Sequence, residues 1–169
     1  MSLIEKYPQE IKTILAKYPP EQKRSAVMPL LYLAQREGGY TSLEAMKEIG
    51  AMLDISVTDV ASIVGFYTLF HDKKTGKYHM QVCTDLSCSL RGADQFLETL
   101  CEKLQVDVGE TTDDGLITIE EVKCLAACDK APMFQVQGED GIEYHENMTI
   151  DKTMELIDSL RKADKEVKK

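Results

Sequence analysis

No run of apolar residues in this sequence approaches the length of about 20 residues that a membrane-spanning helix needs. The N-terminal residues MSLIEKYPQEIK also lack a charged leader followed by an apolar block, so we expect no secretory signal. Basic residues are too few to balance the acids, with 20 Lys and Arg against 29 Asp and Glu. Because nucleic-acid binding depends on clustered basic side chains, we expect a protein partner, no nucleic acid and no direct membrane insertion.

The remaining composition is that of an ordinary soluble globular protein, with 43% hydrophobic and 29% charged residues among 169. This length accommodates one domain of usual size, or a smaller domain preceded by a helical extension. The patterns along the chain favour the second arrangement.

Residues 2–70 carry apolar side chains at helical spacing. Breaks at 18–20, 38–39 and 53–54 divide this part into four expected helices. β-Branched residues are frequent from 55 to 64, but their spacing favours a helix there as well.

Two of these helices begin with capping patterns, in which a hydroxyl accepts hydrogen bonds from the free amides of the first turn. One pattern is Thr41 with Glu44, and the other is Ser56 with Asp59. The same stretch, 41–70, could also form a helix-turn-helix. It contains four acids and a single base, however, whereas a recognition helix needs basic flanks, so DNA binding is not favoured.

The polar run 71–76 ends in glycine and is the expected junction between two units, 1–72 and 73–169. Strands and helices alternate after it, and the order strand, helix, three strands, helix is typical of the α+β class. We therefore expect an N-terminal helical bundle followed by an α+β domain. The expected elements are strands at 77–82, 116–122, 133–137 and 142–145, with a hairpin turn at 138–141, and helices at 93–104 and after Thr149, which can cap the last one.

Four of the five cysteines form two pairs, Cys83 with Cys88 and Cys124 with Cys128, each pair following an expected strand. In a chain without a secretory signal, cysteines serve metals or catalysis more often than disulfides. Four thiolates match a 2Fe-2S or a 4Fe-4S cluster. Because the 35 residues 89–123 separate the pairs, each pair can chelate one iron of a two-iron cluster.

Structural zinc is the main alternative for four cysteines, although it prefers two-residue spacers and the spacers here have four and three residues. A thiol-disulfide oxidoreductase also usually has a two-residue spacer. Plant-type ferredoxins need a further cysteine where this chain has Arg91. The spacing therefore favours an iron-sulfur cluster and leaves zinc open.

Other residues near these motifs have simpler expected roles. Cys101 falls on the apolar stripe of its helix and is expected to be a small buried residue, not a ligand. The histidines at 71, 79 and 145 lack metal-type spacing and are expected at the surface or at strand ends. The charges of the cysteine loops, such as Lys123, are expected to be solvated. Pro132 is expected to shape the entry to the next strand; most X-Pro bonds are trans, but the sequence leaves the isomer of this bond open.

The motifs together resemble the small thioredoxin-like 2Fe-2S subunit of NADH:quinone oxidoreductase, respiratory complex I, which is the E subunit of the bacterial enzyme. The resemblance spans nearly the whole chain. It rests on the segments VGFYTLF at 64–70, CTDLSCSLRG at 83–92, CLAAC at 124–128 and APM at 131–133.

This resemblance implies a thioredoxin-like fold and one 2Fe-2S cluster bound by all four paired cysteines. It also implies an electron carrier that docks on a larger subunit, which binds FMN and NADH and has its own iron-sulfur cluster. The assembly would be the peripheral arm of a membrane-associated complex on the cytoplasmic side. The sequence agrees with this division, because it has no glycine-rich dinucleotide fingerprint, and the isolated chain is not expected to oxidise NADH.

Related small subunits occur in NAD-reducing hydrogenases and NAD-linked formate dehydrogenases, and these remain alternatives, with a zinc-binding interaction protein as a more remote one. The resemblance also implies that the N-terminal helices clasp the flavin subunit. The aromatic group Phe66, Tyr67 and Phe70 lies at helical spacing, and we expect it to pack within the bundle.

Overall fold

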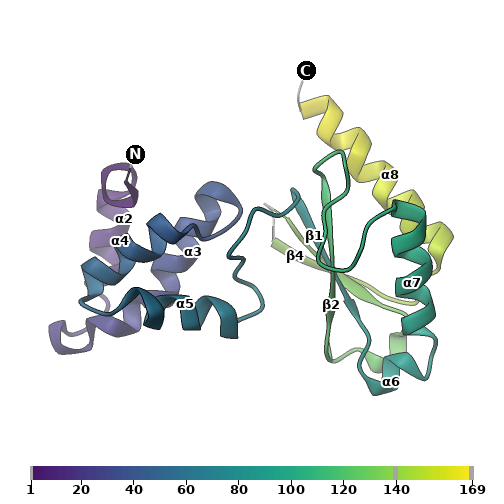
Figure 1. Cartoon of the computed structure of the whole chain (residues 1–169), viewed down its shortest axis with the longest axis horizontal. Coiled ribbons are helices and arrows are strands. Elements are labelled where there is room, and N and C mark those ends of the chain that lie inside the picture. Colours follow the sequence, from purple (N-terminus) through teal and green to yellow (C-terminus); the bar gives the residue numbers. More distant parts are fainter. Residues whose placement is uncertain (1, 139–140, 168–169) are drawn as a thin grey trace. The chain divides into compact units, whose positions relative to one another are not determined.

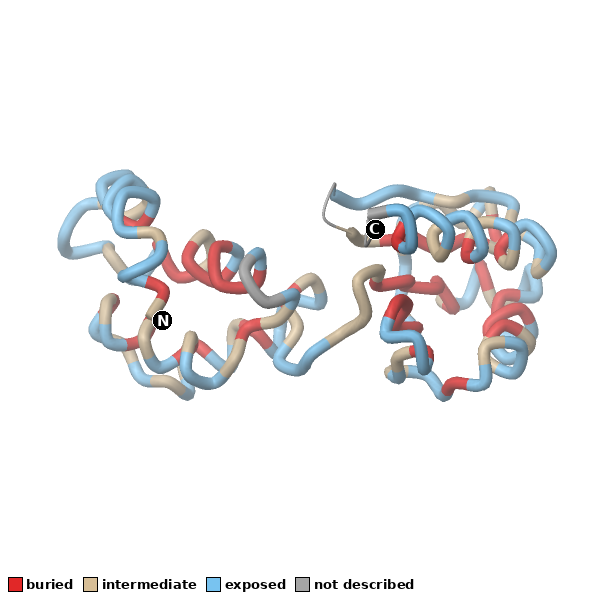
Figure 2. Tube along the Cα trace, turned by 90° about the horizontal axis from the view of Figure 1, so that it is seen from above, coloured by how far each residue is buried: buried red, intermediate tan, exposed pale blue. Residues whose placement is uncertain are grey.

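The computed structural model describes residues 2–138 and 141–167. The chain divides into two compact units, Met1–Lys74 and Thr75–Lys169 (Figure 1). Buried residues occur in both units (Figure 2).

The first unit is helical, as expected, but its helices are more broken than the sequence pattern predicts. The first expected helix is two, because Tyr7 takes a non-helical conformation and Pro8 begins a new helix. The second expected helix begins with a 3-10 segment that starts at Pro20. The elements are α1 (Leu3–Lys6), α2 (Pro8–Leu15), η1 (Pro20–Ala26), α3 (Val27–Gly38), α4 (Leu43–Leu53) and α5 (Val57–Phe66).

One of the two expected caps is wrong and the other is confirmed. The N-cap of α4 is Ser42, whose hydroxyl accepts from the amide of Ala45 at 3.2 Å. Thr41 is instead fully buried, and its own amide donates to the carbonyl of His71 at 2.7 Å. Ser56 caps α5 as expected and accepts from the amide of Asp59 at 3.0 Å.

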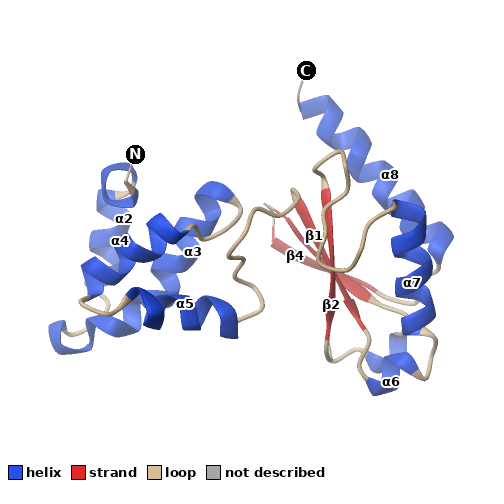
Figure 3. Cartoon of the chain, in the orientation of Figure 1, coloured by secondary structure: helices blue, strands red, loops and turns tan. Residues whose placement is uncertain are grey.

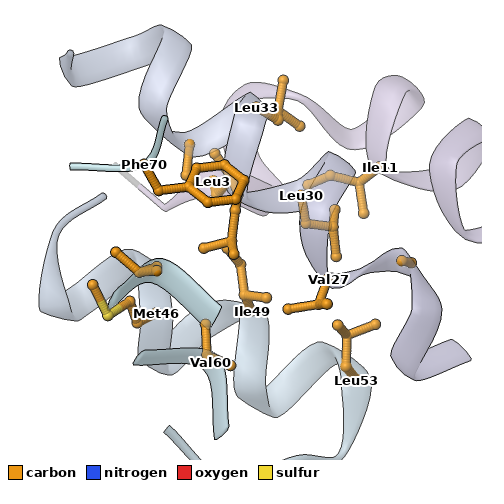
Figure 4. Packing of buried hydrophobic residues seen from close by; sticks show 14 residues of the cluster. Leu3, Ile11, Val27, Leu30, Leu33, Met46, Ile49, Leu53, Val60 and Phe70 are labelled. Carbon is orange, nitrogen blue, oxygen red and sulfur yellow. The ribbon is translucent and has the colours of Figure 1, made fainter. Parts of the chain in front are cut away.

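The core of the first unit joins side chains from all of its α-helices and from the segment after α5. Phe70 is buried there, with its ring centroid 4.7 Å from that of Tyr32. Phe66 is 77% exposed, so the expectation that it packs in the bundle is wrong. Figure 4 shows the packing of Leu3, Ile11, Val27, Leu30, Leu33, Met46, Ile49, Leu53, Val60 and Phe70.

Among the described helices, none is by itself long and apolar enough to cross a membrane. The pair α4 and α5 reaches that length and apolarity only together, across a bend of 119°.

The second unit is a mixed four-stranded sheet with helices (Figure 3), which confirms the α+β class. Its strands lie in the order β2-β1-β3-β4, with β1 parallel to β2 and the other pairs antiparallel. The elements are β1 (Tyr78–Cys83), α6 (Leu86–Ser89), α7 (Ala93–Leu104), β2 (Ile117–Val122), η2 (Cys128–Lys130), β3 (Phe134–Gly138), β4 (Gly141–His145) and α8 (Ile150–Val167).

The connections of this unit agree with the expected elements in part. Thr149 accepts a hydrogen bond from the amide of Lys152 at 3.3 Å, as a cap of α8 should. The expected hairpin joins β3 to β4, although its turn residues Glu139 and Asp140 lie outside the described residues. The bond between Ala131 and Pro132, whose isomer the sequence leaves open, is cis.

Helices α7 and α8 pack on the sheet and share one core with alternate side chains of its strands. This core includes Phe96 and Leu100 of α7, Ile157 of α8 and Met80 of β1. The alternate residues of β1, which point to the opposite face of the sheet, are His79, Gln81 and then Cys83. One face of the strand therefore packs in the core, and the last residue on its other face is a cysteine.

Gly76 fixes the start of β1 against β2. Its amide donates to the hydroxyl of Thr118 at 2.6 Å. A Cβ atom at this position would lie 2.7 Å from the carbonyl oxygen of Leu116, which is closer than non-bonded atoms approach. The glycine at the end of the expected junction is thus required by close backbone packing.

Candidate metal centre

The strand register brings both cysteine pairs to the same edge of the sheet. Because β1 and β2 are parallel, their carboxyl ends meet at this edge, and Cys83 is the register partner of Val122. Cys88 follows in α6, Cys124 lies two residues beyond Val122, and Cys128 begins η2. Two segments that are distant in sequence therefore present their thiols at one place.

The four thiols differ in their access to solvent. Cys83 is 1% exposed and Cys88 is fully buried, whereas Cys124 is exposed and Cys128 is intermediate. Cys83 and Cys88 pack with Ala93, Ala131 and Met133 in a small cluster of buried residues. One pair thus lies inside the unit, and the other closes the site from the solvent side.

The second cysteine loop has an unusual backbone conformation. Cys124 and Ala126 have φ angles of 43° and 60°, in the left-handed region that residues with a side chain rarely adopt. In the same loop, the amides of Cys124 and Leu125 donate to the sulfur of Cys83, which also accepts from the amide of Asp85. Backbone amides aimed at sulfur stabilise a thiolate, which is the form that binds metals.

Three of the thiols interact directly. Cys88 shares hydrogen bonds with both Cys83 and Cys128. Burial opposes ionisation of Cys83, but the amides and the Cys88 thiol that donate to its sulfur outweigh this and lower its pKa. Burial, and then the neighbouring Cys83, raise the pKa of Cys88 to about 12. The pair therefore accepts one negative charge readily and a second only with a cation to compensate it.

The donor set fits an iron-sulfur cluster better than a single metal ion. A tetrahedral zinc site would need four thiolates around one centre. A two-iron cluster spreads its four thiolates over two centres, which suits two chelating loops.

Polar contacts link the residues beside these cysteines. The hydroxyl of Thr84, 7% exposed as a residue, donates to the carboxylate of Glu121 at 2.5 Å and accepts from the Lys123 ammonium at 3.0 Å. Lys123 also forms an ion pair with Glu121. Bonds from Lys123, and then from Thr84, lower the pKa of the Glu121 carboxyl. Farther along, Arg91 Nε donates to the carbonyl of Ala131 at 3.2 Å.

Sequence reasoning missed Thr84 and Glu121, and it treated Lys123 as a solvated charge. Thr84 directly follows Cys83 and Lys123 directly precedes Cys124, and this adjacency is the sequence feature that could have marked them as part of the site. The contact itself depends on the parallel register of β1 and β2.

The remaining candidates lie apart from this centre. Cys101 is half-buried on α7, packs against the sheet core, and has its pKa raised by burial and then by the charge of Asp107. His79 is buried within β1, with Nε2 2.9 Å from the carboxylate of Glu120. The expectation of a surface or strand-end position is therefore wrong for His79.

Comparison with known proteins agrees with the donor set. The family model of the thioredoxin-like [2Fe-2S] ferredoxins matches residues 11–161. The chain is 42% identical to the E subunit of the NADH-quinone oxidoreductase of Rickettsia conorii, over 88% of this chain and 87% of the relative. It is 41% identical to NADH-quinone oxidoreductase subunit 2 of Thermus thermophilus, over 79% of this chain and 74% of the relative.

A solved structure has a similar fold at low sequence identity. A chain of an air-oxidised NAD+-reducing [NiFe]-hydrogenase superposes with a TM-score of 0.65 and 16% identity, over 79% of this chain and 23% of that longer chain. This likeness concerns the fold alone. The match of the family model over most of the chain, together with relatives above 40% identity, shows that the chain belongs to the thioredoxin-like [2Fe-2S] ferredoxin family.

Proposed function

We propose that this chain is an electron-carrier subunit of an NADH:quinone oxidoreductase and holds one 2Fe-2S cluster on Cys83, Cys88, Cys124 and Cys128. The observation that carries the proposal is the convergence of two cysteine loops at one sheet edge, in a chain that is 42% identical to a small subunit of such an enzyme. When bound, such a cluster accepts and releases one electron at a time.

The protein's own residues supply the binding environment. Cys83 and Cys88 provide thiols inside the unit, where water is excluded. The amides of Asp85, Cys124 and Leu125 donate to the sulfur of Cys83, and such bonds stabilise the more negative, reduced form of a cluster. The exposed side, at Cys124, is the short route for an electron to a partner.

We further propose that the chain docks on a larger subunit that binds FMN and NADH and has its own iron-sulfur cluster. Leu86 and Leu90, on either side of Cys88, are 72% and 81% exposed and give the cysteine loop an apolar rim. Exposed apolar residues that gather beside a functional group are typical of protein contact sites. The exposed Phe66 of α5 supports a second contact through the helical unit.

In this proposal, residues 1–72 form the docking domain and residues 73–169 the cluster domain. The complete assembly would be the peripheral arm of a membrane-associated complex on the cytoplasmic side. NADH oxidation would then belong to the partner, because this chain has no glycine-rich dinucleotide fingerprint.

The test is the metal content of the full chain, purified without oxygen. We expect a red-brown protein with about two irons and two sulfides per chain, whose visible absorbance is bleached by dithionite. A colourless protein with one zinc ion per chain would refute the proposal.

The equivalent part of an NAD-reducing hydrogenase is the second candidate function. The similar fold of the hydrogenase chain favours it, but the higher identity to quinone oxidoreductase subunits favours the first candidate. The larger subunit that co-purifies with the chain would decide between them, because only a hydrogenase assembly would reduce NAD+ with hydrogen.

A further inference from the structure

A polar triad spans the gap between the two cysteine loops. It consists of Thr84, Glu121 and Lys123, and each member contacts the other two. Thr84 is bonded covalently to Cys83 and Lys123 to Cys124. The triad therefore joins the first cysteine of one pair to the first cysteine of the other.

Thr84 is the member that gives the triad its rigidity. Its hydroxyl both donates and accepts, and its amide donates to the carbonyl of Val122 at 3.1 Å. The Lys123 and Glu121 side chains are 67% and 40% exposed, and an ion pair this exposed contributes little by itself. A buried hydroxyl between two charged groups forms stronger, charge-assisted hydrogen bonds and fixes their geometry.

The second loop needs such a restraint. Cys124 and Ala126 are both in the left-handed region although neither is glycine. Each such residue is strained and keeps its conformation only where the surroundings hold it. Lys123 is the residue at which this strained segment leaves β2, so its bond to Thr84 fixes the direction of the loop.

We propose that Thr84, Glu121 and Lys123 form a clasp that sets the separation of the two cysteine loops and thereby retains the cluster. The clasp rests on the proposed function, since it presupposes that the four cysteines bind a 2Fe-2S cluster. Its members are positioning residues: they hold the loops that hold the ligands.

The test compares two substitutions of the same residue in the full chain. Thr84→Val keeps the shape of the side chain and removes the hydroxyl, whereas Thr84→Ser keeps the hydroxyl. We expect Thr84→Val to release iron to a ferrous chelator about tenfold faster than the unsubstituted chain, the size of change expected from one lost charge-assisted hydrogen bond. We expect Thr84→Ser to behave like the unsubstituted chain.

The electron paramagnetic resonance spectrum of the reduced cluster supplies a second readout, because a change in loop separation alters the geometry around the irons. Thr84→Val should shift this spectrum and Thr84→Ser should not. Thr99→Val, which removes a hydroxyl that donates within α7 to the carbonyl of Gln95, is the control and should leave both readouts unchanged.

Each outcome separates the clasp from the proposed function. An unsubstituted chain without iron and sulfide would overturn both. A normal cluster in that chain, with an unchanged release rate and spectrum in Thr84→Val, would overturn the clasp alone. If Thr84→Val does not fold, Glu121→Gln takes its place with the same expected changes, and loss of the fold in both variants would show that the triad serves folding instead.

Discussion

At the scale of single residues, the four paired cysteines differ most in their exposure to solvent. Cys124 is exposed and Cys88 is fully buried, with a pKa raised to about 12 by burial and by Cys83. In the cluster-free protein we therefore expect an alkylating reagent at neutral pH to modify Cys124 first and Cys88 last, because only accessible thiolates react quickly. Mass spectrometry of the digested protein would measure the order, and equal rates at these two positions would contradict it.

Single substitutions of cysteine test the ligand assignment. Cys83→Ser and Cys124→Ser should each lower iron and sulfide content sharply, because each removes one thiolate ligand. Cys101→Ser is the matched control and should leave the content intact, because Cys101 packs against the sheet core on α7. Loss of the cluster in Cys101→Ser, with the circular dichroism spectrum unchanged, would overturn the assignment.

The spacing of residues in the sequence predicts metal ligands but not contacts between different strands. Soft ligands in two pairs predict a metal centre from sequence alone, and the structure brings those pairs to one edge. The partnership of Thr84 with Glu121 and Lys123 could not be predicted in this way, because it exists only once two strands lie side by side in one register. The buried position of His79 was missed for a similar reason, since its partner Glu120 belongs to another strand.

At the scale of secondary-structure elements, the missing side chain of Gly76 allows β1 and β2 to approach closely. We expect Gly76→Ala to destabilise the second unit by about 1–3 kcal/mol, because the added Cβ would meet the backbone of Leu116 and Ile117 at 2.7–2.8 Å. Thermal unfolding followed by circular dichroism would measure the change. Gly65→Ala is the matched control: nothing lies within 4 Å of a Cβ there, and alanine in a helix should be neutral or stabilising.

The contact between α8 and the turn before β2 should make stability depend on pH. Burial opposes ionisation of Asp114, but bonds from Thr112, Leu116 and Arg161 outweigh it and lower its pKa below the ordinary aspartate value. A carboxyl with a lowered folded-state pKa stabilises the fold above its unfolded pKa, and this contribution is lost as the pH falls through the folded pKa.

We therefore expect Asp114→Asn to cost about 0.5–1 kcal/mol at pH 7, a small value because the Asp114 side chain is 41% exposed. The difference from the unsubstituted chain should begin to shrink below about pH 4, where Asp114 of the unfolded chain becomes protonated, and it should vanish as the pH falls through the lower folded-state pKa. Urea unfolding at pH 7 and pH 3 would measure both values. A difference that stays constant between them would exclude the charge of Asp114 as its cause.

Local sequence signals predicted the elements well and their ends less well. The cap at Ser56 followed from its own three-residue pattern. Thr41 and Ser42 are adjacent hydroxyl residues, and their order in the sequence does not show that Thr41 is buried while Ser42 caps α4. The first expected helix is broken at Tyr7, because Pro8 begins a new helix and is not accommodated in a helix interior. The apolar periodicity continues across this proline and therefore does not reveal the break.

At the scale of the whole molecule, the proposed function assigns electron transfer to this chain and NADH oxidation to a larger partner subunit. We expect the isolated full chain, loaded with its cluster, to show no NADH oxidation with an artificial electron acceptor. NADH oxidation by the flavin-free chain would contradict this prediction. Addition of the co-purifying larger subunit is the positive control and should restore the activity.

The fold class could be predicted from the order of the strand and helix patterns, and its thioredoxin-like identity from the resemblance that the cysteine segments carry. The cis bond before Pro132 could not be predicted, because both isomers fit the same sequence and trans is the more frequent one. The exposure of Phe66 was missed because helical spacing does not reveal which positions a bundle of several helices leaves uncovered.

The parallel register of β1 and β2 has a consequence for insertions and deletions. Although 35 residues separate Cys88 from Cys124 in the sequence, the position of Cys124 in space depends on where β2 ends beside β1. A residue added to the turn before β2 would leave every thiol where it is. A residue added within β2 would turn its side chains to the opposite face and displace Cys124 by one position, so we expect the site to tolerate insertions in this connection but not in the strand.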